Sequence, residues 1–224
     1  MTIQEAMLAR HSVRQFEEGP LKEAHVDGIL SLIREINEES GLHIQLVLDD
    51  PDCFDNFWAH YGKFSGARHY LALVGQKNRP DLQRLCGYYG EKLVLEVQRM
   101  GLNSCWVAGS YDRRNCQVKK AEGEKLVCII ALGYGLNPGR SHRSKAMRKL
   151  CNLPEDAMPD WFRAGMEAAL LAPTAINQQR FYVILENDKV RIKDKKGPYS
   201  QIDLGIVQYH FEVGAGRKVL TTSS

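Results

Sequence analysis

Apolar residues recur along the chain in two patterns, one with helical spacing and one with the continuous run of a buried strand. Between positions 22 and 36, for example, Val26, Ile29 and Ile33 share one face of a helix that follows Pro20. The helical pattern predicts helices over residues 2–9, 22–36, 80–100, 160–171 and 204–213. The short apolar runs predict strands over residues 42–48, 69–74, 104–107, 125–132 and 180–185, and a hairpin edge over 190–196.

Predicted helices and strands are interspersed along the chain, and this mixture indicates an α+β fold. We expect a mixed, mostly antiparallel sheet of about four or five strands, flanked by long helices. One domain is expected over residues 1–220, and the polar tail 221–224 is expected to be disordered.

A weak internal repeat lies within this domain. Residues 21–48 can be placed over 158–185 without a gap, and Gly28 then falls on Gly165. The repeat predicts a first copy, a linker and a partial second copy, at about residues 1–136, 137–157 and 158–217. An internal pseudo-two-fold would relate the copies, whereas chance similarity between amphipathic segments is the alternative explanation.

The composition is that of an ordinary globular protein. Of 224 residues, 44% are hydrophobic and 25% are charged, which excludes wholesale disorder, collagen and coiled coil. A net charge of +3 is too small to indicate a nucleic-acid or membrane partner. The longest apolar run, 126–132, is too short to cross a bilayer, and the N-terminus has no signal-peptide core. We therefore expect a cytoplasmic protein.

The cysteine spacing points to no metal or redox site. No CxxC or CxxH pair occurs among the six cysteines, which stand at 53, 86, 105, 116, 128 and 151. The spacing therefore predicts neither a zinc site nor a redox dithiol. We expect all of them to be reduced thiols, buried or incidental, and we expect no bound metal.

The segment RHSVRQF at 10–16 carries a concentrated set of phosphate-binding groups. Arg10 and Arg14 supply forked guanidinium donors, and Ser12 adds a short hydroxyl. In an extended segment these three side chains project to one side. The pattern is that of a phosphate clamp, although a solvated basic segment is the simpler explanation on physical grounds alone.

A second polar segment, APTAINQQ at 172–179, lies between a predicted helix and a predicted strand. Pro173 stops the helix, and Asn177 and Gln179 place amide donors and acceptors on a loop. Such groups suit the polar edge of a planar heterocycle, and a solvated turn is the alternative.

Together, RxSxRxF followed by APTxxNxQ resembles the FMN-dependent nitroreductase family. GLNSCWVAG at 101–109 is similar to that family's GLxxxW strand, and LGYG at 132–135 to its closing strand. The resemblance covers most of residues 3–215. It implies a nitroreductase-like fold and bound FMN.

The position of the second motif departs from the family pattern. In ordinary members it follows the first helix after RxSxRxF, and the enzyme is a homodimer with FMN at the interface. Here that place holds EINEESGL at 35–42, which has no proline, and the motif appears in the repeat instead. The chain thus resembles a monomeric, pseudo-dimer branch of the family, which implies one flavin per chain. A homodimer is the alternative.

The resemblance also implies which residues contact FMN. Arg10, Ser12 and Arg14 match residues that bind the phosphate and ribityl chain, with His11 beside them. The residues expected along the flavin ring or its side chain come from the second motif and are Pro173, Thr174, Ala175, Asn177 and Gln179.

Further contacts are implied outside the two motifs. Lys63 matches a lysine near the flavin N1–C2=O edge, and Ala108 and Gly109 fall where a backbone N–H approaches N5. Arg143 and Lys145 would add positive charge at the phosphate.

Two positions differ from the usual family residues. Ala175 stands where a second hydroxyl is common, and Arg180 stands where proline is common, which alters the charge of the pocket. Four large aromatic residues either wall a substrate pocket or simply fill the core, namely Trp58, Tyr61, Phe64 and Trp106.

By this resemblance the chain is an FMN-dependent NAD(P)H oxidoreductase. NADH or NADPH would deliver a hydride to flavin N5, and a small electrophilic acceptor such as a nitroaromatic or quinone would then be reduced in ping-pong order. No protein acid or base is predicted. The alternatives are an FMN storage or sensor protein without rapid turnover, a relative with other flavin chemistry, and a degenerate interaction module.

Overall fold

The computed structural model describes residues 1–55 and 62–220. Two of the predicted pocket aromatics, Trp58 and Tyr61, and the tail 221–224 lie outside the described residues. None of the described helices combines the length and the apolar character needed to span a membrane.

The chain divides into two compact units. Apart from Met1, the first unit comprises Ala9–Leu82 and Leu93–Ser141. The second unit comprises Thr2–Leu8, Gln83–Lys92 and His142–Ser224.

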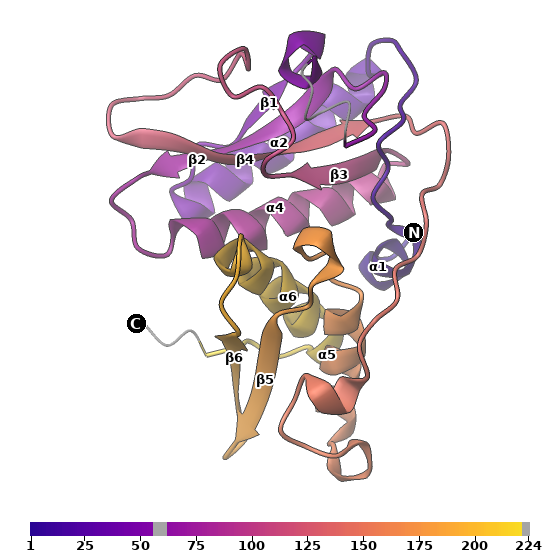
Figure 1. Cartoon of the computed structure of the whole chain (residues 1–224), viewed down its shortest axis with the longest axis vertical. Coiled ribbons are helices and arrows are strands. Elements are labelled where there is room, and N and C mark those ends of the chain that lie inside the picture. The colour runs from indigo at the N-terminus through magenta and orange to yellow at the C-terminus, as the bar shows by residue number, and fades with distance from the viewer. Residues whose placement is uncertain (56–61, 221–224) are drawn as a thin grey trace. The chain divides into compact units, whose positions relative to one another are not determined.

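The centre of the first unit is a four-stranded antiparallel sheet with the order β1-β2-β4-β3 (Figure 1). Its strands are β1 (Gln45–Val47), β2 (His69–Gln76), β3 (Asn103–Val107) and β4 (Glu124–Gly133). The two central strands are buried along almost their whole length, so their sequences are continuous apolar runs instead of alternating ones. The predicted α+β fold with a mostly antiparallel sheet is confirmed.

Two long helices of the chain begin and end close to the predicted positions. Helix α2 (Glu23–Ser40) buries Ile29, Ile33 and Ile36, and α4 spans Leu82–Arg99. Helix α2 runs past the predicted end at 36 because Gly41, at φ 67, is the residue that takes the left-handed cap conformation. Its N–H donates to Asn37 O at 2.9 Å.

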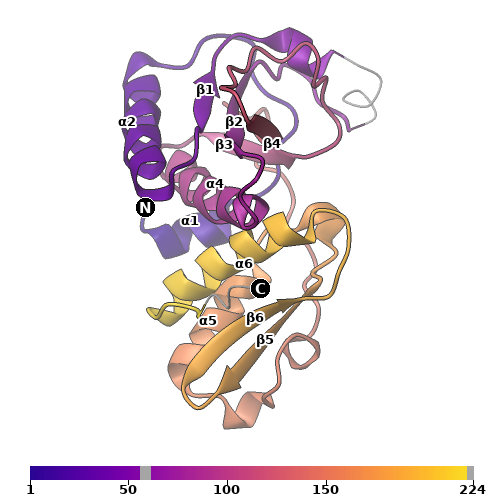
Figure 2. The same ribbon diagram turned by 90° about the vertical axis from the view of Figure 1, so that its left-hand side faces the viewer.

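The second unit contains two packed helices and a hairpin (Figure 2). Its main elements are α5 (Asp160–Leu170), β5 (Phe181–Glu186), β6 (Lys189–Asp194) and α6 (Ser200–Ala215). The rings of Phe162 and Phe211 meet at a centroid distance of 5.6 Å and join α5 to α6. The hairpin forms a two-stranded sheet of its own, separate from the four-stranded sheet. The short α1 (Ile3–Ala9) precedes both motifs in the chain.

The order of elements repeats along the chain. A helix, a strand, an antiparallel strand and a second helix follow one another as α2-β1-β2-α4 and again as α5-β5-β6-α6. This is the order in which the sequence repeat places its two copies. The pseudo-two-fold and the boundaries of the copies stay predictions.

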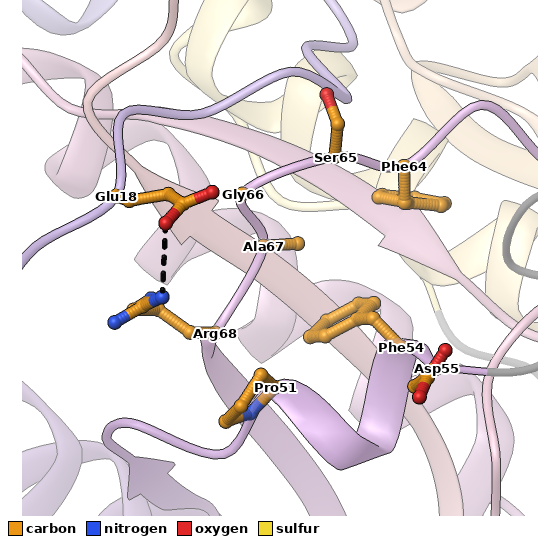
Figure 3. Close-up of a pocket in the computed structure, with 9 residues that line it drawn as sticks. All are labelled: Glu18, Pro51, Phe54, Asp55, Phe64, Ser65, Gly66, Ala67 and Arg68. Atoms are coloured by element: carbon orange, nitrogen blue, oxygen red, sulfur yellow. Dashed lines mark ion pairs between the residues drawn. The ribbon is translucent and has the colours of Figure 1, made fainter.

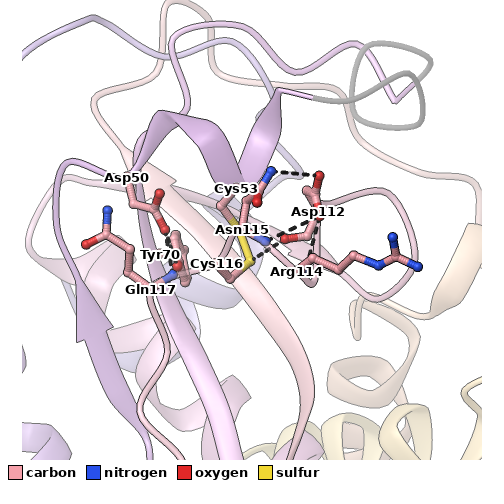
Figure 4. The surroundings of a disulfide bond; sticks show 8 residues. All are labelled: Asp50, Cys53, Tyr70, Asp112, Arg114, Asn115, Cys116 and Gln117. Atoms are coloured by element: carbon pink, nitrogen blue, oxygen red, sulfur yellow. Dashed lines mark hydrogen bonds between the residues drawn. A yellow bond between two sulfur atoms is a disulfide. The ribbon is translucent and has the colours of Figure 1, made fainter.

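The cysteines depart from the expectation. Cys53 and Cys116 form a disulfide across a sequence separation of 63, so the prediction of reduced thiols is wrong for this pair (Figure 4). The free cysteines of the described residues are all buried, and they are Cys86, Cys105, Cys128 and Cys151. Spacing rules detect only neighbouring cysteines, whereas folding brings this distant pair to a Cα–Cα distance of 4.7 Å.

Hydrogen bonds surround the disulfide and tie the β3–β4 loop to the short helix η1 (Pro51–Phe54) (Figure 4). The N–H of Asp112 donates to Cys53 O at 2.8 Å. Buried Asp50 accepts from the Tyr70 hydroxyl at 2.6 Å and from the N–H of Gln117 at 3.0 Å. Burial, together with the bond to Asp50, raises the pKa of Tyr70 well above its usual range.

Candidate functional site

The RHSVRQF segment is held extended in the first unit by backbone hydrogen bonds on both of its sides. The N–H of Val13 donates to Ser104 O on β3 at 3.0 Å. Phe16 donates to Ser65 O at 2.9 Å, and Ser65 donates back to Arg14 O at 3.0 Å. Val13 is buried, and alternation along the extended segment sends Ser12 and Arg14 to the side opposite Val13.

The three predicted clamp side chains lie in the surroundings of one buried thiol, that of Cys105 on β3. Burial raises the pKa of Cys105, while the charges of Arg14 and Arg10 and a hydrogen bond with Ser12 act in the opposite direction. The Ser12 hydroxyl therefore lies beside this thiol, and both guanidiniums are close enough for their charges to act on it. Arg10 is only 4% exposed, whereas Arg14 is exposed, so the group extends from the core to the surface. Such a donor set matches the oxygens of a phosphate ester.

The segment after β4 runs along the clamp. Leu136 N–H donates to Gln15 O at 2.9 Å. Gly139, at φ 74, lies so close to half-buried His11 that an added Cβ would approach His11 Cβ to 2.7 Å. This close approach requires glycine at position 139.

Three further predicted residues of the first unit lie at chain positions next to these contacts. Lys63 is exposed, at φ 63, two residues before the Ser65 that pairs with the clamp. Half-buried Ala108 and exposed Gly109 follow the end of β3, the strand that pairs with the clamp at Ser104.

In the second unit, the APTAINQQ loop forms the sharp connection between α5 and β5. The short helix η4 (Ala175–Asn177) lies within it. Ile176, Asn177 and Gln179 have φ values of 46, 54 and 42, a conformation that is rare for residues other than glycine. Ile176 is 97% exposed. A loop of this shape needs specific contacts to hold it.

Asp203 of α6 supplies the central contact. Its carboxylate accepts from Ala175 N–H at 3.0 Å and from the Gln178 amide at 2.9 Å. The Thr174 hydroxyl accepts from Gln179 N–H at 3.0 Å and closes the loop on itself. Asp203 is 4% exposed, and burial raises its pKa against the lowering effect of these hydrogen bonds.

The basic segment predicted to lie at the phosphate packs on the same loop. Lys145 Nζ donates to Gln178 O at 2.5 Å and to Gln179 O at 3.2 Å. Arg143 O accepts from the Asn177 side chain at 2.9 Å. The buried amide of Gln179 accepts from Lys145 N–H at 2.7 Å. Arg143, Lys145, Asn177 and Gln179 are thus brought together in the second unit, and their contacts with a phosphate or flavin stay predictions.

The comparison with protein families decides what kind of protein carries these two segments. The family model described as "Putative TM nitroreductase" matches residues 2–215, nearly the whole chain. The chain belongs to this nitroreductase family.

Solved structures agree with this family assignment. A "putative nitroreductase" from Thermotoga maritima is 22% identical with a TM-score of 0.72, and the match covers 100% of this chain and 90% of that one. A "putative nitroreductase" from Desulfovibrio desulfuricans in complex with FMN is 15% identical with a TM-score of 0.54, covering 69% of this chain and 98% of that one.

A third structure, from Parabacteroides distasonis, is described as "Putative NADH dehydrogenase/NAD(P)H nitroreductase". It is 18% identical with a TM-score of 0.51, and the match covers 66% of this chain and 95% of that one. These likenesses confirm the predicted nitroreductase-like fold. No curated protein matches this chain.

A pocket of about 200 Å³ opens in the first unit (Figure 3). Phe64, one of the predicted pocket aromatics, lines it with Phe54 at a ring-centroid distance of 5.5 Å. Arg68, at its edge, pairs with Glu18 at 3.7 Å. The pocket is smaller than the roughly 300–1,000 Å³ of typical small-molecule sites, so we assign it no ligand. Trp106 lies half-buried on β3.

Sequence reasoning missed two residues that the structure places at the predicted segments. Cys105 lies under the clamp, and Asp203 lies under the loop. Asp203 is a lone acid in the apolar stretch IDLGIV, and that contrast was its one signal in the sequence. Among the described residues, no group of three or more His, Cys, Asp or Glu is placed to hold a metal ion.

Proposed function

We propose that the chain is an FMN-dependent NAD(P)H oxidoreductase that reduces a small electrophilic acceptor. The observation that carries the proposal is the extended RHSVRQF segment, which backbone hydrogen bonds to Ser104 and Ser65 hold in place. It carries two guanidiniums and a hydroxyl in the surroundings of Cys105, and such a donor set fits a phosphate ester. Family membership supports the same conclusion. When bound, FMN supplies the redox chemistry that links a nicotinamide donor to the acceptor.

The clamp has the first task in this proposal, which is to hold the FMN phosphate and ribityl chain. Arg10 and Arg14 donate to the phosphate oxygens, and Ser12 donates a shorter hydrogen bond, with His11 adjacent. Arg143 and Lys145 add positive charge that favours the same dianion.

The remaining proposed contacts orient the ring and set its charge. Lys63 stabilises negative charge at the N1–C2=O edge, and the small Ala108 and Gly109 let a backbone N–H approach N5. The residues proposed to line the ring or its side chain are Pro173, Thr174, Ala175, Asn177 and Gln179. The polar loop residues position a planar heterocycle, and no protein acid or base is needed.

Removal of the clamp charges tests the cofactor assignment. Each charge-assisted phosphate contact contributes about 1.5–3 kcal/mol, so Arg10→Ala with Arg14→Ala should weaken FMN binding by roughly two orders of magnitude or more. Binding is measured by quenching of flavin fluorescence. The control is Arg34→Ala with Lys77→Ala, which removes the same charge from exposed positions elsewhere in the first unit. Unchanged FMN affinity in the clamp variant would show that the clamp is misassigned.

Anaerobic stopped-flow absorbance tests the reaction itself. Protein reconstituted with FMN is mixed with NADH or NADPH, and rapid bleaching of the flavin is the expected result. A flavin that binds tightly and stays oxidised with both donors would instead indicate a storage or sensor protein.

A further inference from the structure

Four cations gather at the base of the β5–β6 hairpin in the second unit. We call them the hairpin-base cations, and they are Lys149, Arg180, Lys195 and Lys196. All four are exposed. None of them is among the residues proposed above to contact FMN.

Hydrogen bonds hold these residues next to one another. Lys195 N–H donates to Arg180 O at 3.1 Å, and Lys195 Nζ donates to Lys149 O at 3.2 Å. Arg180 Nη1 donates to Lys196 O at 2.9 Å. The two side-chain bonds each use one donor of the Lys195 ammonium or the Arg180 guanidinium, so both groups keep further N–H donors for a ligand.

Among the described residues, the basic side chains at this end of the hairpin take part in no ion pair. In the described part of the chain, no carboxylate forms an ion pair with any of the hairpin-base cations. Asp194 is the acid next to them in sequence, and it accepts from Ser200 Oγ at 2.8 Å and from the Gln201 amide at 2.9 Å.

The turn end of the same hairpin shows the opposite arrangement. There Arg191 pairs with Glu186, and Arg217 pairs with Asp188 at 3.0 Å. Gathered like charges repel one another, so an unpaired cluster beside a paired one indicates a place where an external anion binds.

The cluster adjoins the loop that is proposed to contact the flavin. Arg180 directly follows Gln179 in the chain. The Gln178 amide donates to Pro198 O at 2.9 Å, and Lys145 Nζ donates to the carbonyls of Gln178 and Gln179. The hairpin-base cations therefore lie in the same unit as the loop that is proposed to contact the flavin. They are available there to bind an anionic group of a molecule that reacts with the flavin.

We propose that the hairpin-base cations bind the 2′-phosphate of NADPH and make NADPH the preferred donor. This inference rests on the proposed function. The two nicotinamide donors differ only by this phosphate, and a phosphate dianion is the group that arginine and lysine donors recognise together. The FMN phosphate is assigned to the clamp in the first unit, so the cluster in the second unit is available for another phosphate.

Donor titrations of the FMN-loaded full-length protein test the proposal. The rate of flavin bleaching is measured against NADPH and NADH concentration to obtain a Kd for each. The Kd for NADPH is expected to be lower by about tenfold or more, and Lys195→Ala with Lys196→Ala should remove this difference and leave the Kd for NADH unchanged. Arg180→Ala should act in the same direction.

A matched control comes from the other end of the hairpin. Lys189→Ala removes one exposed charge at the turn and should leave both Kd values unchanged. Equal affinity for the two donors in the wild type would overturn the proposal. An equal loss of affinity for NADPH and NADH in the Lys195/Lys196 variant would also overturn the proposal.

A second titration works without turnover and separates this inference from the proposed function. Adenosine 2′,5′-bisphosphate and adenosine 5′-monophosphate are titrated calorimetrically into the wild type and the Lys195/Lys196 variant. Tighter binding of the bisphosphate, lost in the variant, supports the 2′-phosphate site even if neither donor bleaches the flavin. Binding of inorganic phosphate as tight as that of the bisphosphate would reveal a general anion site and overturn the inference.

Discussion

One buried polar residue, Asp203, holds the APTAINQQ loop in shape. Its carboxylate satisfies one backbone N–H and one side-chain amide of a loop with three left-handed residues. The sequence of the loop does not reveal this support, because Asp203 lies 28 positions from Ala175. The predicted loop location and the predicted amide-bearing residues nevertheless follow from local sequence alone.

Removal of the Asp203 carboxylate should loosen the loop. Asp203→Ala leaves the Ala175 N–H without its acceptor and removes one of the two acceptors of the Gln178 amide. Each unsatisfied donor costs about 1–3 kcal/mol of unfolding free energy. Chemical denaturation measures this loss. A variant as stable as the wild type would show that the loop does not depend on Asp203.

The raised pKa of Asp203 gives this residue a defined pH dependence. Burial raises its pKa above the ordinary value of 3.8, so the folded state holds the proton more tightly than the unfolded chain does. Its contribution to stability therefore falls as the pH rises from 3.8 through the raised pKa. Relative to Asp203→Asn, which does not titrate, the wild type should gain stability between neutral pH and about pH 4. A stability difference that is constant, or that changes in the other direction, would contradict the assignment.

At the scale of elements, close contacts between distant segments set the positions of helices and loops. In the second unit, an added Cβ at Gly205 of α6 would lie 2.0 Å from Arg84 O, and one at Gly87 would lie 2.0 Å from Ile202 O. These two glycines let helical segments approach backbone to backbone. The helices themselves were predicted from apolar periodicity, but the crossing point requires the folded structure.

Gly205→Ala should destabilise the protein by about 1–3 kcal/mol, since the methyl group meets backbone that cannot move aside easily. Gly28→Ala is the matched control in the interior of α2, where an added Cβ meets only the flexible end of Met100 at 3.1 Å. The better helix propensity of alanine should make that variant as stable as the wild type or more so. Thermal unfolding of both variants measures the difference, and equal effects would argue against a close helix crossing.

The Cys53–Cys116 disulfide should stabilise the first unit by limiting the unfolded chain. For a separation of 63 residues, the expected contribution is about 2–4 kcal/mol. Cys53→Ser with Cys116→Ser should lower the free energy of unfolding by this amount. Reductant should lower the stability of the wild type equally and leave the variant unchanged, and a wild type that does not respond to reductant would show that the bond does not form in solution.

At the scale of the whole molecule, each chain carries one clamp and one APTAINQQ loop. The repeated element order supports the interpretation that the chain supplies from its second copy what a partner subunit lends in ordinary family members. Family membership and the nitroreductase fold were predictable because motif order and spacing are properties of the sequence.

We therefore predict one FMN per chain and a monomer in solution. Titration of the protein with FMN should saturate at one FMN per chain. Light scattering should give a mass near 25.4 kDa. A mass near twice that value would establish a homodimer and overturn the pseudo-dimer interpretation.

By itself, the sequence determined the helices and strands, the buried central strands, the two polar motifs and the family. These depend on local periodicity, turn residues and motif spacing, which act over a few residues. Only the tertiary structure decided that Cys53 meets Cys116, that Cys105 lies beside the clamp, that Asp203 supports the loop and that the hairpin-base cations lie near one another. Those contacts join residues far apart in the chain, and their energies exist only once packing of the core has brought the elements together.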